Sequence, residues 1–503
     1  MASRSGADKQ ALYKNFGKTE ANFRKQRLET TVCLRKQKRE EEIIKRRNCP
    51  TVSDDELTPN NSSEVQLETL TEEQKEIAQK HLEKLFKDDA DTIVEALEFF
   101  KYLLSKDSKC VFSKVLVLYN ENAVVKRLLV LLEFDHLNER FDDIRNDVLW
   151  CFANLTAGAT EQTQILVDFG LIDRLVGILN CLPVNQQIAI QCLWALGNVA
   201  GECAELRDRC IAAGLVALVG RALSLPPGRL PEGSDNDDAD DNSHASGRRR
   251  QQRELLAVAA WTAANLCRGA QRPPQLQLVL PLLAPLSALI LCSNRSDWSD
   301  LIGDQALSDA LSAIGNLSDG PDERLKPLLQ QVGLLKRVVQ LLMHSNVKVI
   351  DHCRCLCVQQ ALRAVGNVAT GADHHTQAVL DAAVLPCLKH LLNSPKETVR
   401  KDALWTVSNV TAGSRKQIQA VVSAGLLPNG GPLRWRQLQD AQRAAGGSAA
   451  QCAALLDAGA VAPLCDLLTV VGDTELVGVA LDGLEALLSK AEKARKNKAA
   501  SGG

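Results

Sequence analysis

The sequence predicts an all-α fold in which short helices stack as repeats. Apolar residues make up 45% of the 503 residues but aromatic residues only 4%, so the core is mostly Leu, Val, Ile and Ala. This mixture suits helices that pack on helices. Six segments also share an apolar stretch, an Asn and a small-residue stop ending in Gly, which is typical of a helix with a C-terminal glycine cap. They are LWCFANLTAG (149–158), LWALGNVAG (193–201), AWTAANLCRG (260–269), LSAIGNLSDG (311–320), LRAVGNVATG (362–371) and LWTVSNVTAG (404–413).

The spacing of these segments indicates the type of repeat. Successive equivalent positions lie 44, 67, 51, 51 and 42 residues apart, near the period of about 40–47 residues that armadillo and HEAT repeats have. The longest interval contains residues 225–250, a polar and charged stretch that we expect to be a disordered insertion. Most Gly stops precede a second motif such as VDFGLIDRLVGIL (167–179), which predicts a short helix, a tight turn at Gly and a Leu-rich helix. Three helices per repeat favour an armadillo-type, right-handed superhelical solenoid.

These patterns predict the domain organisation of the chain. Residues 429–447 do not follow the repeat pattern and are flanked by Gly and Pro. The expected segments are a basic arm at 1–50, a flexible linker at 51–70, armadillo repeats over 71–490 and a disordered tail at 491–503.

Charge is distributed unevenly, although the net charge is only −2. Residues 1–50 contain 14 basic and 6 acidic residues, whereas the rest of the chain contains 45 basic and 55 acidic residues. A basic arm on an acidic body predicts that the arm seeks an acidic partner and that the body attracts basic ligands. The charge run alone is equally typical of a solvated helix or of a nucleic-acid-binding arm.

Four repeats carry a Trp four residues before their Asn, which places both side chains on one helix face. One isolated pair would indicate only a buried Trp beside a structural Asn. However, the residue three positions before each equivalent site is polar in five of six repeats, so we expect this face to be exposed to solvent. The pairs are Trp150/Asn154, Trp194/Asn198, Trp261/Asn265 and Trp405/Asn409.

Such a row would recognise basic side chains on an extended peptide. Stacked repeats place equivalent helices side by side on a concave surface. Parallel Trp rings would leave slots for the methylene stems of Lys or Arg. Asn side chains can hold a peptide main chain, and acidic groups can receive the ammonium or guanidinium group.

The same residues carry a family resemblance. The segments WALGNVAG-ECAELRD (194–208), WTAANLCRG (261–269), RAVGNVATG (363–371) and WTVSNVTAG (405–413) resemble successive armadillo repeats of importin-α. Residues 13–48 resemble its importin-β-binding domain, and the resemblance covers about residues 10–490. It implies a nuclear import adaptor that binds nuclear localisation signals and links cargo to importin-β, in the cytoplasm and the nucleus. The alternative is an armadillo scaffold that binds other extended peptides.

The resemblance also implies site residues, with Glu202 standing where the family usually has Asp. For the major signal-binding site they are Trp150, Asn154, Gly158, Thr163, Gln191, Trp194, Asn198, Glu202, Trp261, Asn265, Arg268 and Asp309. For the minor site they are Arg363, Asn367, Asp402, Trp405 and Asn409. The expected autoinhibitory residues are Lys45, Arg46 and Arg47. The expected importin-β-binding residues are Arg24, Lys25, Arg27, Arg35, Lys36, Lys38 and Arg39.

Three departures from the family pattern weaken part of this site. The fifth repeat has Ser312 and Asn316 where the family has Trp and Tyr, and residues 429–447 lack the Trp/Asn pair of the eighth repeat. The chain ends soon after the expected ninth repeat, so contact with the export receptor is in doubt. We therefore expect peptide capture to rest on the N-terminal part of the row.

Other classes of protein have little support in the sequence. The HCRCLC stretch (352–357) lacks a Cys-x-x-Cys pair, and we expect no metal site and no cofactor. His374 and His375 are expected in an exposed turn. Phosphate-binding glycine loops and nucleophile elbows are absent from the sequence, so we predict no enzyme. Scattered cysteines indicate reduced thiols, and no apolar run is long enough for a membrane span. We expect neither membrane nor nucleic acid as a partner.

Overall fold

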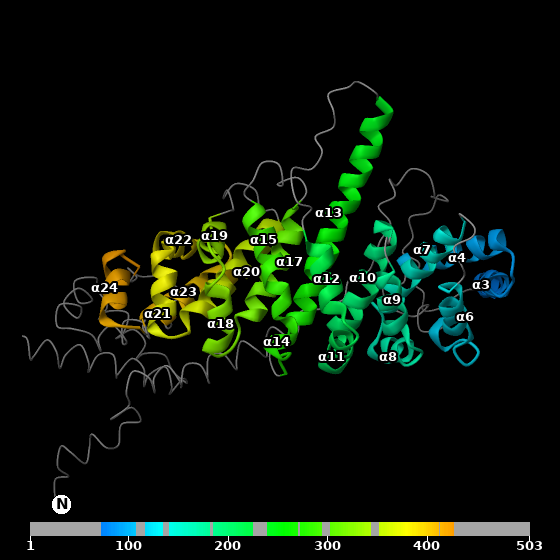
Figure 1. Cartoon of the computed structure of the whole chain (residues 1–503), viewed down its shortest axis with the longest axis horizontal. Helices are drawn as coiled ribbons and strands as arrows, with labels where there is room; N and C mark the ends of the chain where they lie inside the picture. The colour runs from blue at the N-terminus through cyan, green and yellow to red at the C-terminus, as the bar shows by residue number, and fades with distance from the viewer. Residues whose placement is uncertain are drawn as a thin grey trace, which may run out of the picture. The chain divides into compact units, whose positions relative to one another are not determined.

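Every element assigned in the described part of the chain is a helix (Figure 1). The computed structural model describes residues 72–106, 116–133, 140–181, 185–224, 239–269, 272–293, 302–343, 352–411 and 413–426. The basic arm, the linker and all residues after 426 lie outside these ranges. The chain divides at Asn316 and Leu317 into two compact units. We call the described residues up to 316 the N-terminal unit and those from 317 the C-terminal unit.

The N-terminal unit begins with three helices and continues as groups of one long and two shorter helices. The first three are α3 (Glu72–Leu85), α4 (Ala90–Lys106) and α6 (Ala123–Leu131). The groups are α7 (Arg140–Leu155), α8 (Thr160–Asp168) and α9 (Leu171–Asn180); α10 (Gln186–Glu202), α11 (Ala204–Ala212) and α12 (Leu215–Leu223); and α13 (Ala239–Cys267), α14 (Leu276–Val279), the 3₁₀ helix η1 (Leu280–Leu282) and α15 (Leu283–Cys292). The last long helix is α17 (Asp304–Leu317).

The C-terminal unit repeats the same order of elements. It contains α18 (Asp322–Leu329), α19 (Leu334–Leu341), α20 (His352–Ala369), α21 (Asp373–Asp381), α22 (Val384–Leu391), α23 (Glu397–Thr411) and α24 (Arg415–Ser423). This succession of a long helix and two shorter ones confirms the predicted armadillo fold with three helices per repeat.

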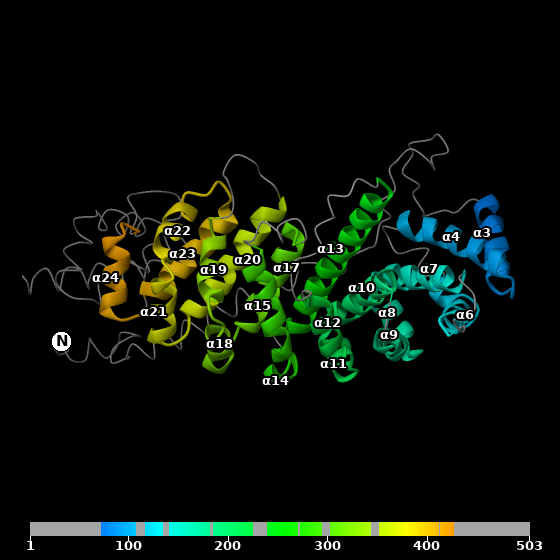
Figure 2. The ribbon, with the colours of Figure 1, turned by 45° about the horizontal axis from the view of Figure 1, so that its top comes forward.

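One expectation about the insertion was wrong. Residues 239–250, which we assigned to a disordered insertion at 225–250, form the first part of the 29-residue helix α13. This part projects beyond α10 and α12 (Figures 1 and 2). Helix α13 thus begins well before its apolar face.

Left-handed residues separate the two short helices in four of the described repeats, whereas α14 and α15 are joined by the 3₁₀ helix η1. Gly170, Gly214 and Gly333 have φ values of 86°, 91° and 80° at these turns. Glycine adopts this conformation without a steric penalty, which explains the Gly in the second motif. The turn between α21 and α22 has Ala383 at φ 62° instead, so this repeat carries backbone strain.

Several short helices begin with a side chain that caps its own first turn. The Oε1 atoms of Gln162 and Gln417 accept hydrogen bonds from the amides of Ala159 and Ser414. His375 performs the same role through Nδ1, which accepts from the amide of Ala372 at 3.2 Å. Our expectation of an exposed turn was therefore wrong for His375, which is buried, although His374 is exposed.

The long helices form the core of each unit. In the N-terminal unit α7 packs on α10 and α10 on α13, and in the C-terminal unit α20 packs on α23 (Figure 2). Cys151, Cys192 and Cys210 are free and buried in the core, and burial raises the pKa of the Cys210 thiol to about 12. No helix in the described ranges is long and apolar enough to cross a membrane.

Candidate functional site

The Trp/Asn pairs lie on neighbouring long helices. In the N-terminal unit they come from α7, α10 and α13, which pack in that order. In the C-terminal unit the expected minor-site residues come from α20 and α23, which also pack together. The row predicted from sequence spacing is therefore assembled within each unit.

Four Asn side chains join their repeat to the backbone of the preceding one. The Nδ2 amide of Asn198 donates to the carbonyl of Ala153, and that of Asn265 donates to Gly197, both at 2.9 Å. Asn316 donates to Ala264 at 3.0 Å, although its repeat lacks the Trp. In the C-terminal unit Asn409 donates to Gly366 at 3.3 Å. In these four cases the acceptor is the residue three positions after the first position of the Trp/Asn pair, or its equivalent, in the previous repeat.

The Trp rings pack on the same residues. A Cβ atom placed on Gly197 would lie 2.6 Å from Cζ3 of Trp261, closer than side chains approach one another. A Cβ on Gly366 would overlap the ring of Trp405 in the same way. The absence of a side chain at these two positions therefore lets the next repeat's ring settle against the helix backbone.

Our expectation that this face is broadly exposed was wrong. Trp150, Trp261 and Trp405 are only 6%, 3% and 6% exposed, and Trp194 is half-buried. The row's Asn side chains are also buried, except for that of Asn316, which is half-buried. Packing of each ring on the previous repeat accounts for much of this burial.

The polar residues that suggested a wet face also lie in the packed layer. Asp147, Gln191 and Asp309 are buried. The carboxylate of Asp147 pairs with Lys101 of α4, while burial raises its pKa and Lys101 opposes that rise. The carboxylate of Asp309 accepts from Gln305 at 3.0 Å. Polar side chains that find partners on the same or a neighbouring helix need no water, which is why the pattern misled the prediction.

The expected parallel slots between rings also need correction. The rings of Trp194 and Trp261 have centroids 6.2 Å apart and are tilted by 56°. A methylene stem between two parallel rings needs a ring separation of about 7–8 Å, twice the contact distance between carbon atoms. The two rings therefore contact each other at an angle, and the half-buried Trp194 offers the more accessible aromatic surface.

Two charged residues of the expected major site, Glu202 and Arg268, lie at the ends of α10 and α13. Glu202 is half-buried and accepts a hydrogen bond from the Thr160 hydroxyl at 2.7 Å. The guanidinium of Arg268 donates to the carbonyl of Gly201 at 3.2 Å. Both side chains thus lie near the end of α10, which brings a carboxylate and a guanidinium to one edge of the row.

Gly158 and Thr163 shape the turn between α7 and α8. The Thr163 hydroxyl donates to the carbonyls of Thr156 and Ala159, both at 3.3 Å. Gln162 lies against Gly158, where a Cβ atom would collide with its Oε1 atom. These residues therefore hold the turn that carries Thr160, the hydroxyl partner of Glu202.

Three residues of the expected minor site have partners within the C-terminal unit. The guanidinium of Arg363 lies 4.0 Å from the carboxylate of Asp319, and Asn367 donates to the Ser318 hydroxyl at 3.2 Å. Asp402 is half-buried, and its main-chain carbonyl accepts from Thr406 at 3.0 Å. Arg363 stands at the position that Trp occupies in four other repeats. Its cation has the carboxylate of Asp319 nearby.

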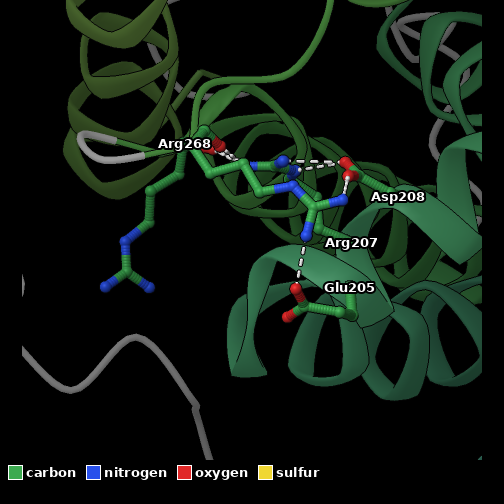
Figure 3. A network of polar contacts seen from close by, with 5 residues as sticks. Glu205, Arg207, Asp208 and Arg268 are labelled. Carbon is green, nitrogen blue, oxygen red and sulfur yellow. Dashed lines mark hydrogen bonds and ion pairs between the residues drawn. The ribbon is translucent and has the colours of Figure 1, made fainter.

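Sequence reasoning missed Arg207, a buried arginine at the start of α11. Its guanidinium joins Asp208 and the end of α13 in a polar network (Figure 3). A signal for it was available, since Arg207 shares the buried face of α11 with Cys210 and Ile211 at helical spacing. A charged residue at such a position needs partners.

Comparison with known proteins identifies the family. The model of the importin beta binding domain matches residues 9–98, and that of the armadillo/beta-catenin-like repeat matches residues 372–412. Importin subunit alpha-1b of Oryza sativa subsp. japonica is 33% identical over 424 residues, which cover 82% of this chain and 68% of the relative. The chain belongs to the importin-α family.

Other members of the importin-α family match over similar lengths. Importin subunit alpha-1a of the same plant is 30% identical over 76% of this chain and 62% of the relative. Importin subunit alpha-2 of Caenorhabditis elegans is 30% identical over 78% and 65%, so the chain spans somewhat less than two thirds of these two relatives. An engineered protein solved by crystallography is 21% identical with a TM-score of 0.54, covers 82% of this chain and 98% of its own, and supports the fold alone.

The importin-beta-binding match extends beyond the arm expected at 1–50. It runs through the expected linker and over α3 into α4. The expected importin-β-binding residues between Arg24 and Arg39, and the expected autoinhibitory Lys45, Arg46 and Arg47, fall within the match but outside the described residues. Membership of the importin-α family supports an adaptor role in nuclear import.

Proposed function

We propose that this chain is an import adaptor that binds basic nuclear localisation signals along the Trp/Asn row and is joined to importin-β through its N-terminal arm. The observation that carries this proposal is an importin beta binding domain match at residues 9–98 and an armadillo repeat match at residues 372–412 in one chain. The cargo site and the cytoplasmic and nuclear distribution are part of the proposal, as is contact with importin-β.

Peptide capture centres on Trp194 in this proposal. Trp194 is half-buried, whereas the rings of Trp150 and Trp261 on either side are nearly covered. A lysine stem lying on this ring gains apolar contact and cation–π attraction, of about 0.5–2 kcal/mol. Glu202, also half-buried, supplies the negative charge for its ammonium group.

The arm regulates this site by competition. The sequence Lys45-Arg46-Arg47 resembles a basic signal and is tethered to the repeats, so its effective concentration at the row is on the order of millimolar. Importin-β binds the arm and thereby leaves the row open to cargo. Only binding equilibria are needed for such a switch.

The test compares peptide binding with and without importin-β. The full chain is titrated with a fluorescent lysine-rich peptide, and we expect importin-β to raise the affinity about tenfold or more. Trp194→Ala should weaken binding by a similar factor, while Tyr102→Ala, which removes a 52% exposed aromatic residue from α4, should not.

Each part of the proposal has its own contradicting result. No capture of importin-β by the chain would contradict the adaptor role. No peptide binding in the presence of importin-β would contradict the cargo role, and equal binding of a neutral peptide would favour a scaffold for other extended peptides. We avoid Asn198→Ala as the diagnostic variant because Asn198 also joins two repeats.

A further inference from the structure

The buried arginine of α11 binds the backbone at the end of α13. Arg207 is 3% exposed, and its Nη1 donates to the carbonyl of Arg268 and, at 2.9 Å, to the carbonyl of Arg272. Its Nε and Nη2 donate to Asp208 at 3.0 and 2.7 Å. The guanidinium thus has neutral carbonyls on one side and a carboxylate on the other (Figure 3).

A second arginine makes the reverse connection. Arg268 donates from Nη1 to the carbonyl of Gly201, at the end of α10. Figure 3 shows its side chain directed away from Arg207 and Asp208. The end of α13 is therefore tied to α11 by Arg207 and to the end of α10 by Arg268. We call Arg207 and Arg268 the arginine clasp.

The clasp suits the chemistry of helix ends. The last carbonyls of a helix have no intrahelical donor and carry the negative end of the dipole. A guanidinium satisfies them and is favoured there by its charge. Gly269, with φ 144°, makes this approach possible, because a Cβ at this position would collide with Arg207 and with the Arg272 carbonyl.

The clasp fixes two groups of the candidate peptide site. Arg268 binds the carbonyl of Gly201, and Glu202 is the next residue. The clasp therefore fixes the backbone that carries the Glu202 carboxylate. Arg268 itself is held through its own carbonyl by Arg207. A displacement of the end of α13 would therefore change the separation of the acidic Glu202 and the basic Arg268.

We propose that Arg207 is a positioning residue that sets the preference of this site for lysine at one position of a bound peptide. The inference rests on the proposed function, because it concerns how the same row reads its ligand. Arg207 acts without touching the peptide. Arg207 holds the backbone of Arg268, and the Arg268 side chain in turn binds the Gly201 carbonyl next to Glu202. Through Arg268 it keeps the Glu202 carboxylate where an ammonium group arrives and keeps the Arg268 charge at a fixed distance from that carboxylate.

The outer part of the network provides a matched control. The side chain of Arg272 is 59% exposed and forms ion pairs with Glu205 and Asp208 at the surface. Exposed pairs of this kind contribute little to stability. Arg272→Met therefore removes an arginine of the same network without breaking the clasp.

The experiment measures peptide discrimination with the full chain and importin-β. The probes are a lysine-rich signal peptide and versions with each lysine in turn replaced by alanine. For the wild-type chain we expect one lysine to matter most, with a loss of about tenfold or more. Arg207→Met should lower the affinity for the parent peptide by about tenfold. In this variant, replacing that lysine by alanine should lower the affinity by only about twofold. Arg272→Met should reproduce the wild-type pattern.

Combination with Glu202→Gln separates positioning from a general structural effect. If Arg207 acts through Glu202, the double variant should bind no more weakly than Arg207→Met alone. Circular dichroism checks folding, and if Arg207→Met does not fold, Arg207→Lys, which keeps the charge and loses the fork of donors, is judged by the same pattern.

The outcomes are distinct. A folded Arg207 variant that keeps the wild-type preference among the lysine positions, or additive effects with Glu202→Gln, would overturn the positioning role and leave the proposed function intact. Absence of peptide binding by the wild-type chain would overturn the proposed function and this inference with it.

Discussion

The indole ring of Trp261 lies against Gly197 of the preceding repeat, and the same glycine accepts the hydrogen bond of Asn265 through its carbonyl. One backbone position thus receives both members of a Trp/Asn pair. Trp405 and Asn409 use Gly366 in the same way within the C-terminal unit. The spacing of four residues has a structural meaning, since it lets a ring and an amide on one helix face reach a single residue of the neighbouring helix.

This relationship predicts that Gly197→Ala destabilises the N-terminal unit. In an ordinary helix the change would stabilise by about 0.5–1 kcal/mol, because Gly loses more entropy than Ala on folding. Here the added methyl group collides with Trp261, and overpacking costs about 1–3 kcal/mol. The midpoint of urea unfolding should therefore fall relative to the wild-type chain.

Gly177→Ala is the matched control for this prediction. Gly177 lies inside α9, and a Cβ at this position would meet nothing within 4 Å. Its replacement should raise the midpoint or leave it unchanged. Equal effects of the two variants would show that the contact of Trp261 with Gly197 does not limit stability.

The repeat pattern was predictable because its causes are local. The recurring Asn and small-residue stop can be found within each segment, and the period of the segments needs no knowledge of contacts. The burial of Trp261 was not predictable in this way, since its packing partner Gly197 lies in another repeat. The polar residue Asp147 misled the prediction for the same reason, because its partner Lys101 belongs to α4.

Arg207 marks a second limit of reading the sequence. It stands in ECAELRD, a segment that suggested the family, yet its partners are main-chain carbonyls whose position only the fold reveals. Residues 239–250 mark a third, since their polar composition predicted disorder although they continue the helix that carries Trp261. A prediction of disorder from composition does not take into account that an apolar helix can continue into a neighbouring charged segment.

The turn between α21 and α22 gives a prediction of opposite sign to the first. Ala383 has φ 62° and ψ 42°, where an L-residue carries strain of about 1–2 kcal/mol. Ala383→Gly removes this strain but makes the unfolded chain more flexible, so the net gain should be about 0.5–1 kcal/mol. Thermal unfolding should show a higher midpoint for this variant.

Gly170→Ala tests the same argument in reverse. Gly170 has φ 86°, and a Cβ there would meet nothing within 4 Å, so conformation alone decides the outcome. This variant should be less stable than the wild-type chain. A lower midpoint for Ala383→Gly would contradict the assignment of strain to Ala383.

His81 of α3 predicts that part of the stability depends on pH. Its ring stacks on Phe99 with centroids 4.1 Å apart and planes within 9°, and burial, with a smaller contribution from Lys84, lowers its pKa below the ordinary value of 6.5. The folded chain thus resists protonation of His81 more than the unfolded chain does. Protonation stabilises the unfolded state first, so stability is lost as the pH falls through 6.5 toward the folded-state pKa.

His81→Phe should remove this dependence, because a phenyl ring keeps the stack on Phe99 and cannot take up a proton. The measurement is the difference in unfolding midpoint between the variant and the wild-type chain at about pH 8 and about pH 5. The variant should gain relative to the wild-type chain at the lower pH, whereas His390→Phe, at an exposed position of α22, serves as the control for replacing a surface histidine. A difference that stays constant between the two pH values would show that His81 is protonated equally in both states, which its burial against Phe99 argues against.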